Sequence, residues 1–176
     1  MGDAARIIDE VGVLDDTVAA TLQKGLERLE FSSDEESLKS AIRLLSVAAI
    51  SKGDRVLILG IADGHLTALA NACGVAVFCV EHDGIHLQQV RKKIDQAQCA
   101  GAVLVSRRLM MGFSEYAPFD SIISQKIVED IPSRWLEQLS TENGKLVTPI
   151  QTGETTQLFL FEKNGDSLQK IALESW

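Results

Sequence analysis

The sequence predicts an α/β fold, a three-layer sandwich whose mostly parallel, doubly wound sheet ends in an antiparallel hairpin, with a helical lead-in before it. Apolar runs such as RVLILG at 55–60 suit strands that are covered on both faces. These runs alternate with segments of helical period, which favours right-handed βαβ crossovers. The segment TQLFLFEKNGDSLQKIAL has two runs of alternating character around Asn164 and Gly165, which indicates a closing hairpin.

The first 50 residues are expected to be helical. Residues 3–30 place apolar side chains at helical spacing, and the stretch GVLDD interrupts them where Asp15 or Asp16 can cap a second helix. The stretch SSDEES at 32–37 then offers Ser and Asp caps for a helix in LKSAIRLLSVAAI. Two or more helices should therefore precede the first strand.

Residues 51–176 are expected to form the α/β core of a single domain that spans 1–176. A chain of 176 residues can bury one sizeable core and is short for two domains. After the strand RVLILG, the period predicts these elements in order: helix 65–73, strand 75–80, helix 84–98, strands 102–106 and 120–124, helix 132–140, strand 145–149, and an antiparallel segment over 156–173.

Composition argues against several classes of function. A net charge of −8 and a pI near 4.9 disfavour binding to nucleic acid. Three cysteines without metal-type spacing fit a reducing compartment, so we expect a cytoplasmic protein. No stretch of about 20 residues is continuously apolar, so no membrane association is expected. A protein partner stays open, and so does the oligomeric state.

A series of motifs resembles one enzyme family along most of the chain. The motifs are GVLDDTVAATL, KGDRVLILGIADGHLTALA, FCVEH, APFDSII, IPSRWLEQLSTENGKLVTPI and LFLFEKNGDSLQKIAL. In this order they resemble the protein-L-isoaspartate O-methyltransferases, which have the class I S-adenosylmethionine-dependent methyltransferase fold. The resemblance implies methyl transfer from S-adenosylmethionine to an isoaspartyl carboxylate. Such chemistry depends mainly on positioning the two reactants, so no catalytic residue is assigned.

The resemblance implies that S-adenosylmethionine binds where the first strand turns into a helix. Glycine is favoured in that turn because backbone N–H groups must approach the ligand closely. The expected cofactor-binding residues are Gly60, Ile61, Ala62, Gly64, Glu81 and His82.

The turn departs from the family pattern of an acid followed by G-x-G-x-G. Ile58 stands at the acid position, and Ala62 replaces the middle glycine. The aliphatic side chain of Ile58 cannot accept a hydrogen bond from the cofactor. The methyl group of Ala62 reduces the space in which the cofactor can approach the backbone of the turn. Either the turn still admits the cofactor, or Gly60 and Gly64 only make a tight connection between strand and helix.

Glu81 ends the second core strand, where a carboxylate can accept hydrogen bonds from ribose hydroxyls. The alternative is a solvated acid at a strand end. His82 and His86 are spaced like a metal pair, but no third ligand follows at a recognisable spacing. Surface or capping histidines are the expected interpretation, and no metal site is assigned.

Two further departures concern the adenine and the substrate. The family acid that contacts the adenine amine falls on Arg107-Arg108-Leu109, where a cation replaces an acceptor. The family loop that positions the substrate is missing after Phe31, and the nearest residues are SSDEES, whose acids would repel a carboxylate substrate. Helix capping is the expected role of its Ser32, Ser33 and Ser37.

These departures predict weak or absent cofactor binding and little or no isoaspartyl repair. The interpretation is a divergent member of the family, nominally a methyltransferase. Two alternatives stay open: a non-catalytic binding or interaction protein with this fold, and a methyltransferase with a changed substrate.

Overall fold

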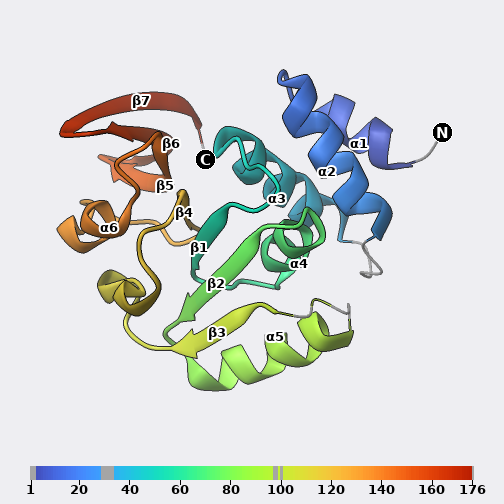
Figure 1. The fold of residues 1–176 in the computed structure, drawn as a ribbon, viewed down its shortest axis with the longest axis horizontal. Helices are drawn as coiled ribbons and strands as arrows, with labels where there is room; N and C mark the ends of the chain where they lie inside the picture. The colour runs from blue at the N-terminus through green and yellow to red at the C-terminus, as the bar shows by residue number, and fades with distance from the viewer. Residues whose placement is uncertain (1–2, 29–33, 97–98, 100, 176) are drawn as a thin grey trace.

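The computed structural model describes residues 3–28, 34–96, 99 and 101–175, and it contains one seven-stranded sheet in the order β3-β2-β1-β4-β5-β6-β7 (Figure 1). Strands β1 to β5 run parallel to one another, whereas the pairs β5–β6 and β6–β7 are antiparallel. The strands are β1 (Arg55–Leu59), β2 (Ala76–Glu81), β3 (Val103–Ser106), β4 (Ser121–Ser124), β5 (Gly144–Thr152), β6 (Thr155–Asn164) and β7 (Ser167–Ser175).

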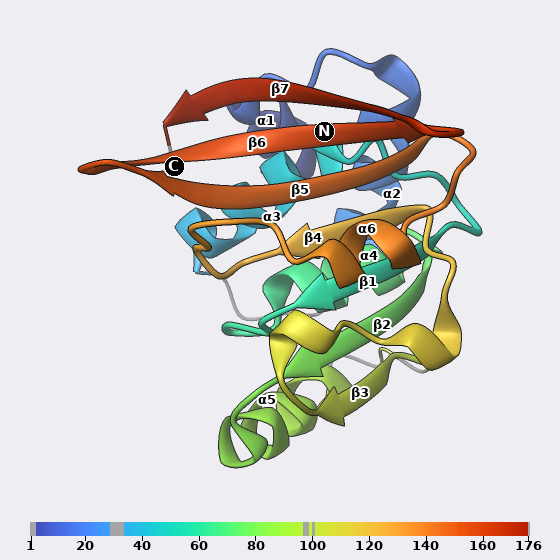
Figure 2. The same cartoon turned by 90° about the vertical axis from the view of Figure 1, so that its left-hand side faces the viewer.

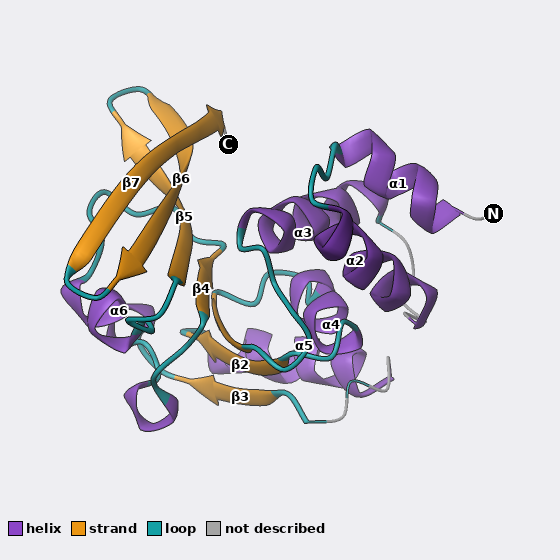
Figure 3. Cartoon of the chain, turned by 45° about the horizontal axis from the view of Figure 1, so that its top comes forward, coloured by secondary structure: helices purple, strands orange, loops and turns teal. Residues whose placement is uncertain are grey.

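Helices lie on both faces of the sheet, and the N-terminal helices stack outside one of these layers (Figures 2 and 3). The helices are α1 (Asp3–Val11), α2 (Asp16–Arg28), α3 (Glu35–Val47), α4 (His65–Ala72), α5 (Gly84–Gln96) and α6 (Ser133–Gln138), with the 3-10 helices η1 (Leu109–Met111) and η2 (Ser114–Tyr116). The predicted fold class is therefore confirmed. Among the described helices, α6, η1 and η2 lie on the second face, which therefore has the thinner layer.

The two faces of β1 belong to two separate hydrophobic clusters, as expected for a strand whose side chains alternate. Val56 and Ile58 pack in the cluster that includes residues of α1 to α5. Leu57 and Leu59 pack in the other cluster, which includes Trp135 of α6. These four side chains are fully buried. The strand RVLILG is thus covered on both faces, which explains its continuous apolar run.

Aspartates cap two of the N-terminal helices. The side chain of Asp15 accepts hydrogen bonds from the backbone N–H groups of Thr17 (2.8 Å) and Val18 (3.0 Å). Of the two predicted caps for α2, the structure therefore selects Asp15. Asp34 caps α3 by accepting from Glu36 N (3.2 Å). Ser32 and Ser33, for which capping was predicted, lie outside the described residues.

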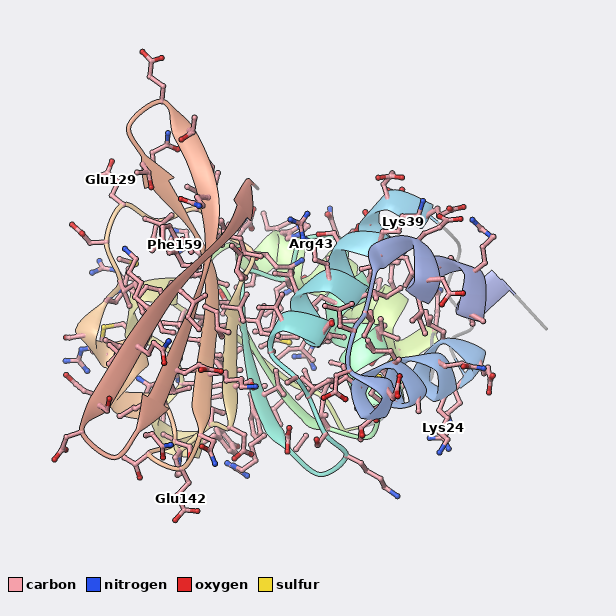
Figure 4. The ribbon with its side chains drawn as sticks, turned by 90° about the horizontal axis from the view of Figure 1, so that it is seen from above. Lys24, Lys39, Arg43, Glu129, Glu142 and Phe159 are labelled. Carbon is pink, nitrogen blue, oxygen red and sulfur yellow. The ribbon has the colours of Figure 1, made fainter. Side chains whose placement is uncertain are left out.

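Ion pairs connect α1 to α3. Nζ of Lys39, which is labelled in Figure 4, lies 2.9 Å from a carboxylate oxygen of Glu10 and 3.0 Å from one of Glu35. Arg6 contacts the same two carboxylates. These side chains are exposed to a large extent, so each pair contributes little to stability.

Several element boundaries differ from the prediction, and the reason is tertiary. The strand predicted at 145–149 extends over Gly144–Thr152, because it pairs with β4 on one side and with β6 on the other. The helix predicted at 132–140 is shorter, Ser133–Gln138. The hairpin turn was predicted at Asn164-Gly165, but Asn164 pairs with Ser167 as the last residue of β6. The turn residues are thus Gly165, whose φ is +59°, and Asp166.

Among the described residues, no helix combines the length and the apolar character that crossing a bilayer requires.

Candidate functional site

The candidate site lies at the carboxyl ends of the neighbouring strands β1 and β4. The chain runs from β1 outward to β2 and β3 on one side, and then returns to β4 on the other side of β1. In open α/β sheets, ligands bind outside the carboxyl ends of the strands at such a switch point. The turn 60–64, which follows β1, stands at this place.

The turn 60–64 has the backbone conformation of a glycine-rich turn. Gly60 and Gly64 have φ values of +83° and +94°, in the region where glycine is favoured. Ala62 adopts φ +45°, a left-handed conformation that costs an L residue about 1 to 2 kcal/mol. A Cβ on Gly64 would lie 2.8 Å from Cγ1 of Val90, so this glycine also allows α5 to pack closely. The turn thus has the conformation of a glycine-rich turn although position 62 is alanine.

The Glu81 carboxylate connects the end of β2 to this turn. Its Oε2 accepts a hydrogen bond from Ile61 N (3.0 Å), and its Oε1 accepts one from Asp83 N (3.1 Å). The residue is only 4% exposed, so the interpretation as a solvated acid is wrong. Burial acts to raise the pKa of Glu81, but the two backbone donors and the nearby Lys126 outweigh burial and hold the pKa below its usual value.

The two histidines near Glu81 have different environments. His82 follows β2 and is exposed. Nε2 of His86, on α5, lies 2.6 Å from the carbonyl oxygen of Ala62, which fixes the left-handed residue of the turn. Within the described part of the chain, no group of three or more His, Cys, Asp or Glu side chains is arranged to hold a metal ion. The structure thus places His86 as a support for the turn.

A second carboxylate supports the start of α4. Oδ1 of Asp63 lies 3.0 Å from Nδ1 of the buried His65, and it also accepts a hydrogen bond from His65 N (3.1 Å). The adjacent His65 ring holds the pKa of Asp63 well below its usual range despite partial burial. Sequence reasoning missed this pair, which connects the turn to the start of α4.

Arg107 is paired with an acid of its own chain. Both of its terminal nitrogens bind Glu115, at 2.8 and 2.9 Å, and its guanidinium lies 4.7 Å from the ring centroid of Phe113. This bidentate bond lowers the pKa of Glu115 to about 2. Arg108 is exposed before η1. Arg107, one of the two cations at the position predicted to face adenine, therefore pairs with Glu115 of η2 and packs on Phe113.

Lys126, just after β4, covers the turn at Gly60. A Cβ on Gly60 would lie 2.8 Å from Cγ and 3.0 Å from Cε of Lys126, so the lysine stem lies directly against the glycine. Sequence reasoning did not single out Lys126. The available signal was its position at the carboxyl end of a strand that neighbours β1.

The comparison with family models decides the membership of this chain. Residues 20–175 match the model described as protein-L-isoaspartate(D-aspartate) O-methyltransferase (PCMT). The chain belongs to the PCMT family. The match includes all seven strands and most of α2, so the resemblance inferred from the ordered motifs is confirmed.

Individual relatives of this PCMT-family chain are similar at modest identity. The protein-L-isoaspartate O-methyltransferase of Chromobacterium violaceum is 33% identical over 120 residues, which is 68% of this chain and 53% of the relative. That of Koribacter versatilis is 28% identical over 132 residues, 75% of this chain and 59% of the relative. The chain thus spans little more than half the length of these curated relatives.

Solved structures agree with the fold of the PCMT-family chain. A protein-L-isoaspartate O-methyltransferase matches 98% of this chain and 63% of its own with a TM-score of 0.80 at 19% identity. A Plasmodium falciparum protein of the same description, in complex with S-adenosyl-L-homocysteine, matches 98% of this chain and 94% of its own with a TM-score of 0.71 at 18% identity. The expectation of an S-adenosylmethionine-type methyltransferase fold is confirmed.

Replacing Glu81 by Gln is expected to lower the free energy of unfolding of this PCMT-family chain by about 2 to 3 kcal/mol, because a buried charged acceptor of two backbone hydrogen bonds is lost. Since the folded pKa of Glu81 is lowered, its contribution is present above the unfolded value near 4.5 and disappears as the pH falls through the folded pKa. Urea unfolding at pH 7 and in acid measures both effects.

The matched control for Glu81→Gln is Glu142→Gln, because the Glu142 side chain is exposed and points away from the molecule (Figure 4). We expect this control to change stability by less than about 0.5 kcal/mol. Equal stability of Glu81→Gln and the control would show that Glu81 does not hold the turn.

Proposed function

We propose that this chain is a divergent PCMT-family protein that keeps the methyltransferase frame, binds S-adenosylmethionine weakly or not at all, and does not methylate isoaspartyl carboxylates efficiently. Family membership supplies the methyltransferase frame. Family members with an intact turn and substrate loop are the reference against which the loss is measured. A reducing, cytoplasmic environment is part of the proposal, since the three cysteines are buried and have no metal-type spacing.

The observation that carries the proposal is the state of Glu81. Each of its carboxylate oxygens already accepts a backbone hydrogen bond, and the residue is almost fully buried. A ribose would have to reach the same two oxygens through the space beside the turn 60–64. The stem of Lys126 lies against Gly60, the first residue of that turn. With these contacts in place, a cofactor has to share the Glu81 oxygens with two backbone donors and to displace the stem of Lys126, so no reaction step is derived through it.

The region expected to bind the substrate independently supports the loss of isoaspartyl methylation. Asp34 and Glu36 stand at the start of α3, in the stretch that replaces the family's substrate loop. Acidic side chains at that place repel a carboxylate substrate. Restoring the cofactor side alone should therefore not restore turnover.

The test measures binding and turnover separately. Loss of two or three hydrogen bonds at about 1 to 2 kcal/mol each is expected to weaken the affinity for S-adenosylmethionine by roughly a hundredfold or more relative to an intact family member. Calorimetric titration with S-adenosylmethionine measures this difference. Transfer of labelled methyl to an isoaspartyl peptide, with the intact family member as a positive control, measures turnover. Micromolar binding or transfer above background would contradict the proposal.

Binding to a partner protein is the second candidate function, and exposed apolar side chains favour it. Ile85, Met110, Met111 and Ile127 are exposed, and they lie in the segments that follow β2, β3 and β4 at the carboxyl edge of the sheet. Apolar side chains grouped around one edge are typical of interaction surfaces. This function does not depend on methyl transfer. In a pull-down, Ile127→Asp is expected to weaken retention of a partner protein, whereas the control Leu14→Asp, at an exposed residue away from this edge, is not.

A further inference from the structure

The position of Lys126 relative to the sheet is fixed by its backbone. Ser124 Oγ donates a hydrogen bond to the carbonyl oxygen of Lys126 (2.9 Å) and accepts one from Lys126 N (3.2 Å). The next residue back, Gln125, donates its N–H to the carbonyl oxygen of Leu59 at the end of β1 (2.9 Å). Only the side chain of Lys126 is therefore able to move away from the turn.

The Lys126 stem has close contact with Gly60. A Cβ on Gly60 would meet Cγ, Cε and Cδ of Lys126 at 2.8, 3.0 and 3.4 Å. These atoms include the inner part of the side chain, which cannot turn aside as easily as its tip. The residue is nevertheless exposed as a whole, so the lysine covers Gly60, where the switch point of the sheet predicts a ligand crevice, and is not part of the core. A ligand that approaches Gly60 has to displace this stem at a moderate cost.

The charge of Lys126 acts on the same crevice. Its ammonium group is among the groups that stabilise the ionised form of Glu81. The two residues thus place one positive and one negative group beside the turn 60–64. The sulfonium of S-adenosylmethionine carries a positive charge, whereas the thioether of S-adenosylhomocysteine is neutral. A nearby ammonium group repels the first ligand and has no such effect on the second.

We propose that Lys126 determines the ligand specificity of this crevice: its stem closes the approach to Gly60, and its ammonium group disfavours a cationic sulfonium relative to a neutral nucleoside thioether. This inference rests on the proposed function, because it names the residue responsible for weak binding of S-adenosylmethionine. It goes beyond that function by assigning a class of ligand that the crevice admits more readily.

Two substitutions separate the steric effect from the charge. Lys126→Met keeps a stem of similar length and removes the charge, whereas Lys126→Ala removes both. We expect Lys126→Met to raise the affinity for S-adenosylmethionine about tenfold and that for S-adenosylhomocysteine less than about threefold. Lys126→Ala should raise both affinities by about tenfold or more. Calorimetric titration at ligand concentrations up to millimolar gives all of these dissociation constants.

Lys52→Met is the matched control. Lys52 also covers a glycine of positive φ, since a Cβ on Gly74 would lie 3.2 Å from Cγ of Lys52. This second contact lies before β1 and β2, at the amino ends of the parallel strands and thus at the opposite edge of the sheet. The substitution removes a similar charge and stem contact, and neither affinity should change.

The outcomes distinguish this inference from the proposed function. An unchanged ratio of the two affinities in Lys126→Met would overturn the inference, and so would the absence of measurable binding in both Lys126 variants at millimolar ligand. Neither result would affect the proposed function. Micromolar binding of S-adenosylmethionine to the unmodified chain would overturn the proposed function, and the ratio across the variants would still decide the role of Lys126.

Discussion

Ile58→Asp is expected to lower the free energy of unfolding by about 4 kcal/mol or more, enough to unfold a marginally stable domain. Ile58 stands where the family has an acid, so this substitution restores the family residue type. However, Ile58 is 0% exposed and lies between Cys79 of β2 and Ile123 of β4 in the central part of the sheet. A carboxylate there loses apolar packing and has no solvent contact.

Urea unfolding followed by circular dichroism measures the effect of Ile58→Asp. Ile58→Val is the control for shape alone and should cost about 1 kcal/mol. Ile127→Asp is the control for introducing the charge, because Ile127 is 53% exposed, and it should change stability by less than about 0.5 kcal/mol. If Ile58→Asp were as stable as Ile58→Val, the interior beside β1 would be open to water.

Trp135→Ala is expected to lower the free energy of unfolding by about 3 to 5 kcal/mol. Trp135 is 1% exposed and belongs to the cluster on the thinly covered face of the sheet. Its Nε1 also donates a hydrogen bond to the carbonyl oxygen of Leu109 (3.0 Å), which joins α6 to η1. The substitution leaves a large cavity and removes one of the two hydrogen bonds that the Leu109 carbonyl accepts, the other coming from Gly112 N. Chemical denaturation measures the combined cost.

The Trp135→Phe variant separates the two contributions. Phenylalanine keeps much of the apolar packing but cannot donate to Leu109, so the loss of stability should fall to about 1 to 3 kcal/mol. Equal losses for the Ala and Phe variants would mean that the hydrogen bond, and not the packing, dominates the role of this residue.

The arrangement of elements was predictable because it depends on local patterns. The run RVLILG identifies a strand that is buried on both faces, and the alternating runs around Gly165 identify the antiparallel end of the sheet. Boundaries were less predictable, since the length of β5 depends on its two neighbouring strands. The turn residues of the hairpin also depend on which residues pair across it.

The candidate site was predictable only in its local part. The spacing from Gly60 to Glu81 predicted that this acid lies near the turn, and the structure brings Glu81 into contact with Ile61. The position of Lys126 depends on the pairing of β1 with β4, which are far apart along the chain. The Arg107 pair with Glu115 depends on how the segment between β3 and β4 folds back.

The edge strand β7 affects how readily the protein aggregates. Within the described chain it pairs with β6 alone, so its other side offers backbone groups to which a foreign strand can attach. A register shift between Gln157 and Phe159 interrupts the regular pairing beside it. Lys170 of β7 places its ammonium group 4.2 Å from the ring centroid of Phe159, which is labelled in Figure 4. An edge strand with irregular pairing and a lysine is a poor template for another strand. These features therefore disfavour fibril growth by strand addition to β7.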